Sequence, residues 1–179
     1  MATAGVVSAE EALVAELELL GIRYLSRQTS YQAAQVRPPD RLLADLARQP
    51  AARVRQAIIA VLLAHPGYAD SVPEALARLD APEALTLRLF YTAAVLLQKR
   101  YAERLRPEVG DEWRWLLDRF SAEFGIPAGD TPLIRKLELL ARAHGTRAGV
   151  TANWAGTYDN VARKLIRRWE MERQWGQKK

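Results

Sequence analysis

The 179-residue sequence contains no cysteine. This absence excludes disulfide bonds, thiolate-ligated zinc and a cysteine nucleophile. Histidine is scarce as well: the chain has two, His65 and His144. Neither has a carboxylate three or four residues further on, where a helical metal pair would need it. The sequence therefore implies no metal and no cofactor.

The sequence patterns of common enzyme classes are missing too. The chain has no His-Glu-x-x-His, Gly-x-Ser-x-Gly, Gly-x-Gly-x-x-Gly or Gly-x₄-Gly-Lys-Ser/Thr run. These patterns mark zinc hydrolases, serine hydrolases, dinucleotide-binding folds and P-loops. The adjacent carboxylates Asp111 and Glu112 have a structural explanation, because acidic residues cap helices and favour their first turn. We expect no catalytic residue.

Long apolar runs and a basic leader are also absent. No stretch reaches the ~20 apolar residues needed to span a bilayer. The first apolar residues are followed by Glu10 and Glu11 and are not preceded by bases. We therefore expect a cytoplasmic protein without membrane contact. The length fits one domain over residues 1–179, with residues 1–7 and 176–179 flexible.

Positive charge is present and unevenly distributed. Residues 157–179 carry seven bases and three acids, which accounts for +4 of the net charge of +5. Residues 22–55 carry seven arginines and two acids, and residues 56–156 balance at twelve of each sign. Two basic segments therefore flank a neutral middle, and they form one patch if the fold brings them together.

Helical periodicity dominates, and strand-like alternation is nearly absent. Residues 57–64 are apolar on every side of a helix, and residues 84–97 contain one charge, at Arg88, so both stretches belong to central helices. We predict an all-α, single-domain bundle of about seven to eight helices. The expected helices cover residues 8–21, 40–48, 51–64, 71–79, 82–105, 111–124, 131–144 and 157 onward.

Local signals set these boundaries. Capping boxes are predicted at Ser8–Glu11, Ser71–Glu74 and Asp80–Glu83. Stops are predicted at helix-breaking residues and at glycines after periodic runs. These stops are Gly21, His65-Pro66-Gly67, Pro107 with Gly110, and Gly145. In the 111–124 helix, the apolar stripe includes Trp113, Leu116, Leu117, Phe120 and Phe124, and Trp115 lies off it.

The middle of the chain contains a faint repeat. Leu46-Ala47-Arg48 and Val61-Leu62-Leu63 recur as Leu76-Ala77-Arg78 and Val95-Leu96-Leu97. Each unit is a short helix, a proline-marked bend and a longer buried helix. This pattern predicts two stacked helical hairpins of the HEAT type, although about three repeats are usual for a stable array.

The last helix carries the first candidate binding residues. Val161, Ala162, Leu165, Ile166 and Trp169 fall on one of its faces. Arg163, Lys164, Arg167 and Arg168 form the other face. Such a row can follow phosphates and release counterions. The alternative is an ordinary solvated face, which amphipathic helices have whatever their function.

Two further segments supply candidates. Asn153, Trp154 and Tyr158 lie where the last helix is expected to begin and could hold a base or a polar ligand. Alternatively, Asn153 or Thr157 caps the helix while the two aromatic residues fill the core. Within residues 22–37, Arg23, Arg27 and Arg37 are interleaved with tyrosine and glutamine, which suits binding of a nucleic-acid single strand or an RNA loop. The alternative is a connection that packs on the core through Ile22, Tyr24, Leu25 and Tyr31.

Three functional hypotheses follow. The leading one is a non-enzymatic interaction protein, which binds a protein partner or its own copy and could use Trp115, Trp154, Trp169 and Trp175, since tryptophan is frequent at interface hot spots. The alternative is a nucleic-acid-binding module that uses segments 22–55 and 157–179. The third is an enzyme with a pocket lined by His144, Asn153, Tyr158 and a carboxylate.

Overall fold

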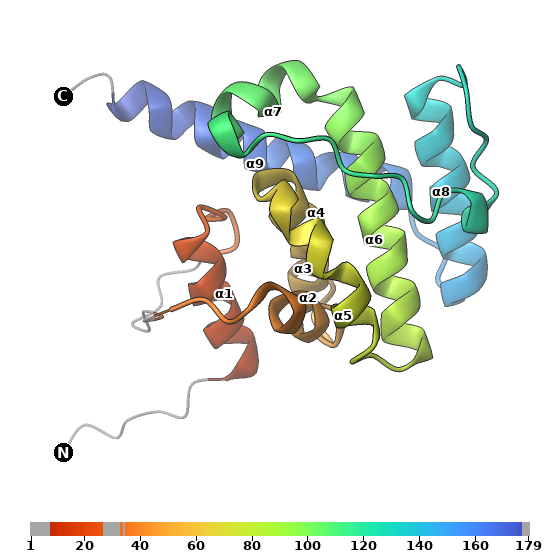
Figure 1. Ribbon diagram of the computed structural model, residues 1–179, viewed down its shortest axis with the longest axis horizontal. Helices are drawn as coiled ribbons and strands as arrows, with labels where there is room; N and C mark the ends of the chain where they lie inside the picture. The colour runs from red at the N-terminus through yellow and green to blue at the C-terminus, as the bar shows by residue number, and fades with distance from the viewer. Residues whose placement is uncertain (1–7, 27–32, 34, 177–179) are drawn as a thin grey trace.

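The computed structural model describes residues 8–26, 33 and 35–176. All regular elements in these residues are helical, which confirms the all-α prediction. Figure 1 shows two long helices, α6 and α9, with the shorter helices arranged around them. Among the described helices, none combines the length and apolar character needed to cross a membrane.

The chain order of the helices is as follows. The α-helices are α1 (Ala9–Leu19), α2 (Pro39–Ala47), α3 (Ala52–Arg55), α4 (Ala57–Ala64), α5 (Val72–Leu76), α6 (Ala81–Arg100), α7 (Ala102–Val109), α8 (Leu133–Ala148) and α9 (Trp154–Gly176). The 3₁₀ turns are η1 (Pro66–Ser71), η2 (Gly110–Glu112) and η3 (Ala122–Phe124).

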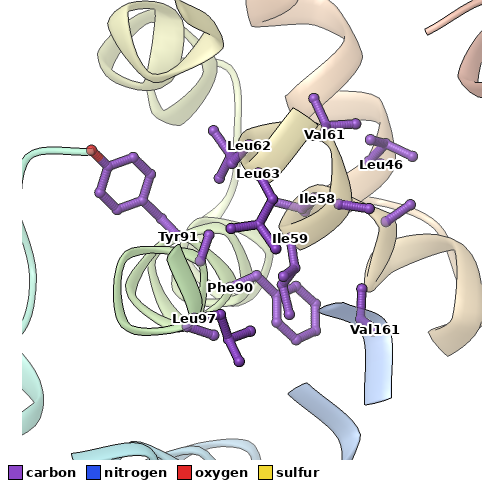
Figure 2. Packing of buried hydrophobic residues seen from close by; sticks show 14 of the residues in the cluster. Leu46, Ile58, Ile59, Val61, Leu62, Leu63, Phe90, Tyr91, Leu97 and Val161 are labelled. Atoms are coloured by element: carbon purple, nitrogen blue, oxygen red, sulfur yellow. The ribbon is translucent and has the colours of Figure 1, made fainter. Parts of the chain in front are cut away.

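The core is built around α4 and α6. Every residue of α4 is buried, and α6 is buried without interruption from Leu89 to Gln98. Figure 2 shows Ile59 of α4 directed toward Phe90 of α6. Because these helices are apolar on all sides, α2, α7, α8 and α9 pack around them. The buried apolar residues form one continuous cluster.

The two predicted hairpins lie against each other. α2 contacts α5, and α4 contacts α6, so the short helices pair and the long helices pair. Within each hairpin, Pro50 or Pro82 lies near the bend, as the sequence pattern suggested. This arrangement fits a stack of two units, and its assignment to the HEAT type stays a prediction.

Of the three predicted capping boxes, one is present. The Ser8 hydroxyl accepts a hydrogen bond from the Glu11 N–H, and Glu11 accepts one from the Ser8 N–H. The boxes at Ser71 and Asp80 are wrong, because neither side chain caps its helix. Ser71 instead ends the 3₁₀ turn η1, so the short helix α5 continues directly from an already turned chain.

The predicted helix over residues 111–124 is wrong. After η2 the chain is extended from Trp113 until the turn around η3, and Figure 1 shows this segment as a tube crossing the molecule toward α8. The segment is held by the buried side chain of Gln98 on α6. Its Oε1 accepts from the Leu116 N–H and its Nε2 donates to the Arg114 carbonyl, each at 2.8 Å.

This contact explains why the helix does not form. Gln98 bonds two main-chain groups of residues 114–116 as a neighbouring strand would, and the Tyr91 hydroxyl donates to the Leu117 carbonyl at 2.8 Å. Leu116 and Phe124 are still buried, whereas Leu117 is 68% exposed. The apolar residues do recur at helical spacing, but part of the segment that contains them is an extended chain.

Several helix ends also differ from the prediction. The 82–105 helix is two helices, because Tyr101 leaves helical geometry between α6 and α7 (φ −112°, ψ 18°), and α7 continues past Pro107. α8 runs through Gly145 and ends at Gly149, whose φ of 67° favours glycine. α9 begins at Trp154 rather than Thr157.

An ion-pair cluster holds Arg37, which precedes α2. Arg37 bonds Glu16 of α1 and Asp45 of α2, each at 2.5 Å. The hydrogen bond to Glu16 raises the pKa of Arg37, although burial opposes the rise. Ile22 and Leu25 are buried and Tyr24 packs on the core, as the connecting-segment alternative predicted. Tyr31 lies outside the described residues.

Replacing Gln98 tests the role of its amide. Gln98→Met keeps the volume and the helix but removes both hydrogen bonds, so we expect a loss of about 2–3 kcal/mol in the free energy of unfolding. Urea unfolding followed by circular dichroism measures this loss, and hydrogen exchange at the Leu116 amide should accelerate. Gln174→Met, on an exposed part of α9, is the control. An unchanged unfolding energy for Gln98→Met would contradict the role given to this side chain.

Candidate functional site

A depression of about 710 Å³ lies between α9 and the junction of α6 with α7. Five cationic side chains line it from three helices: Arg100 of α6, Arg104 of α7, and Arg163, Lys164 and Arg167 of α9. Tyr101, Asn160 and Glu170 complete its lining.

The fold positions these cations through the apolar face of α9. Val161, Leu165 and Ile166 are buried against the core, so the residues between them must point outward. Arg163, Lys164 and Arg167 are accordingly exposed. Arg100 ends α6 beside them, because α9 packs against both α6 and α7.

Two carboxylates organise the depression without neutralising it. Asp159 bonds Arg163 at 2.6 Å and accepts from the Tyr101 hydroxyl at 2.6 Å, and it lies 3.4 Å from Arg100. The pKa of Arg163 is raised, first by its hydrogen bond to Tyr101 and then by the charge of Asp159. These bonds fix the direction of the guanidinium groups.

The depression contains more positive than negative charge. Glu170 pairs with Arg104 at 2.8 Å. Lys164 and Arg167 have no carboxylate partner among the described residues. Five cations facing Asp159 and Glu170 leave a local net charge of +3. The depression can therefore accept an anion without first breaking every ion pair.

The sequence predicted three of the five cations that line this depression. Arg163, Lys164 and Arg167 lie together, but Arg168 points to another side of α9, where it bonds Glu172 at 2.8 Å. Arg100 was missed, as was Arg104, because residues 56–156 are neutral as a whole. The signal was local: both arginines lie in the first six positions after the buried run that ends at Gln98.

The first basic segment does not join the depression. Arg23 reaches α9 but bonds Glu172 at 3.4 Å, and Arg37 is held by Glu16 and Asp45. Arg27 lies outside the described residues. Three further arginines of this segment also have partners. Arg48 bonds Asp45, Arg53 bonds Glu10, and Arg55 bonds the carbonyls of Gln49 and Pro50.

Asn153 caps the N-terminus of α9. Its Oδ1 accepts a hydrogen bond from the Gly156 N–H at 3.0 Å, so one free donor of the first turn is satisfied. A Cβ at Gly156 would lie 2.8 Å from Asn153 Nδ2, too close for an unshifted side chain. The absence of a side chain at position 156 therefore allows this cap.

Trp154 and Tyr158 are buried and surround His144 of α8. The rings of Trp154 and His144 stack with centroids 3.6 Å apart, and the Tyr158 hydroxyl lies 2.5 Å from His144 Nδ1. Burial lowers the pKa of His144 to about 4 and raises that of Tyr158, so the phenol keeps its proton and donates to a neutral imidazole. His144 lies inside α8, which continues to Ala148, and not at the helix end that was predicted at Gly145.

Neither a metal site nor a similarity to known proteins indicates the function. Among the described residues, no group of three or more acidic or histidine side chains is placed to hold a metal. Comparison with models of protein families, with curated proteins and with solved structures finds no match. The function is therefore argued from the geometry of the chain alone.

The buried histidine makes stability depend on pH. Unfolded His144 has its usual pKa near 6.5 and the folded pKa is about 4, so between these values the unfolded chain binds more protons. Stability is full above pH 6.5 and is lost as the pH falls toward 4. We expect a loss of about 1–2 kcal/mol between pH 7 and pH 5, after allowance for partial solvation.

Urea unfolding across pH 5–7.5 measures this slope. His144→Asn should flatten it, because the new side chain does not titrate in this range. His65→Asn changes the other histidine, which bonds the Leu20 carbonyl, and should keep the slope. Equal slopes in the wild-type protein and His144→Asn would contradict the assignment.

Proposed function

We propose that the protein binds nucleic acid through the phosphate backbone, in the depression between α6, α7 and α9. The observation that supports this proposal is the convergence of five cationic side chains from three helices on one hollow. A solvated helix face explains cations on α9 alone. It does not explain why Arg100 and Arg104 face the same hollow from the other side.

The chemistry of the lining suits phosphate. Guanidinium groups hold phosphate oxygens in a two-pronged manner, and Lys164 adds a compact charge between them. Asp159 and Glu170 hold three of the arginines in place, which lowers the entropy lost on binding. Tyr101 and Asn160 offer neutral polar groups to a sugar or a second oxygen.

The proposal implies binding with little sequence preference. Most of the lining groups are charges that contact phosphates, and phosphates carry no sequence information. The proposed location is the cytoplasm, where nucleic acid is available. The first basic segment has no part in this proposal, because none of its described arginines lines the depression.

Salt dependence tests this function. Binding of a fluorescein-labelled 20-nucleotide single strand, of mixed sequence and as DNA or RNA, is measured by anisotropy from 25 to 200 mM salt. We expect Lys164→Ala and Arg167→Ala each to weaken binding and to reduce the slope of log affinity against log salt by about 0.7. Neither residue has a carboxylate partner, so the fold should be unaffected.

Arg41→Ala provides the matched control. It removes one exposed charge from α2, outside the depression, and should leave the slope unchanged. An equal effect of all three variants would mean that binding follows net charge rather than this surface. No binding at 25 mM salt would overturn the function itself.

We propose self-association as a second candidate function. It is supported by the extended segment after η2, where Trp115 is 54% and Leu117 is 68% exposed. The N–H and C=O of Trp115 have no hydrogen-bond partner among the described residues. Gln98 covers one edge of this segment, so the other edge can pair with the same segment of a second copy across a two-fold axis.

Sedimentation velocity from 5 to 200 µM tests this association. We expect a dimer whose dissociation constant rises at least tenfold in the double variant Trp115→Ser, Leu117→Ser. Ile134→Ser, which removes an apolar side chain exposed to a similar degree on α8, should leave the dimer intact. A wild-type protein that stays monomeric at 200 µM would contradict the second candidate.

A further inference from the structure

A second hollow, of about 320 Å³, lies at the opposite end of α6 from the basic depression. It is bounded by the chain between α2 and α3, the first turns of α6, the end of α8 and the start of α9. It shares no lining residue with the basic depression. Its volume falls in the range of small-molecule sites.

One side of this cavity is cationic. Arg55 lines it, and its Nη1 donates to the carbonyls of Gln49 and Pro50, which fixes the guanidinium group. No described residue accepts a hydrogen bond from its Nε or Nη2. Arg48, held by Asp45 and the Arg78 carbonyl, lies on the same side. A carboxylate in the cavity would meet a preset hydrogen-bond donor here.

The cavity is also lined by a carboxylate that has no partner among the described residues. Glu83, in the first turn of α6, lines the cavity, and its Oε2 is buried with no hydrogen bond from any described residue. A buried, unpaired carboxylate oxygen is costly, so this atom requires a donor that the described chain does not provide. An ammonium group is the strongest such donor.

Much of the remaining lining is apolar. Phe90 and Trp154 are buried beside His144, whose ring is clamped by the stack with Trp154 and the bond to Tyr158. Because this histidine is neutral, it adds no charge to the cavity. Pro50 and Val150 extend the apolar lining, so the cavity can take a hydrocarbon side chain.

We propose that this cavity binds a free α-amino acid with an apolar side chain. Its carboxylate would bond Arg55, its ammonium group would bond Glu83, and its side chain would lie against Phe90 and Trp154. A ligand with a single charge would leave Glu83 or Arg55 without its partner, so both groups are required together. This site is independent of the proposed nucleic-acid binding.

Titration calorimetry with three probes tests the proposal. L-phenylalanine carries both charged groups, 3-phenylpropionate lacks the amine, and phenethylamine lacks the carboxylate. We expect L-phenylalanine to bind at least tenfold more tightly than either analogue. Equal binding of one analogue would overturn the zwitterion in favour of a simple anion or cation site. No heat of binding from 10 mM L-phenylalanine or L-leucine would overturn the site.

Variants separate binding from folding. Glu83→Gln should weaken binding of L-phenylalanine at least tenfold without lowering the melting temperature, because the buried oxygen Oε2 has no partner among the described residues. Glu74→Gln removes a carboxylate from the exposed first turn of α5 and should change neither quantity. If Glu83→Gln bound L-phenylalanine as tightly as the wild-type protein, the proposal would be contradicted, because the ligand would then not bind through Glu83.

Discussion

The packing of α6 against α4 is the constraint on which the other elements depend. Neither helix has a polar face in its central turns, so both must be covered on all sides. α9 covers them along one side with Val161, Leu165 and Ile166. This requirement, rather than any attraction between charges, brings the cations of α9 beside Arg100. The basic depression is thus a consequence of how the core is closed.

The same constraint explains which parts of the fold were predictable. A helix that is apolar all round can be recognised from its own residues, so the central helices and the all-α class follow from the sequence. The extended segment after η2 could not be recognised in this way. Its apolar spacing also fits a helix, and the deciding group, Gln98, lies 18 residues before Leu116, with α7 and η2 between them. A single buried amide outweighed the periodicity.

The residues of the candidate sites likewise fall into those that the sequence could predict and those that only the fold reveals. The exposed cations of α9 were predictable, because burial of one helical face fixes the direction of the other. Their partners were not, since the twelve bases of residues 56–156 are balanced by twelve acids and only the fold selects Arg100 and Arg104. Arg37 illustrates the opposite error: a basic residue in a basic segment is held by Glu16, a carboxylate from the acidic start of the chain. Summing the charge over each segment therefore missed Arg100 and Arg104 and wrongly suggested Arg37 as a binding residue.

The two hollows lie at opposite ends of one helix. Glu83 and Arg100 are separated by most of α6, which at about 1.5 Å per residue is on the order of 25 Å. Direct electrostatic coupling over this distance is small, because salt screens charges beyond about 8–10 Å. α9 also contacts both hollows, through Trp154 at one and Arg163 at the other. Any coupling between a ligand in the cavity and an anion in the depression would therefore have to be mechanical, through a shift of α9 along the core.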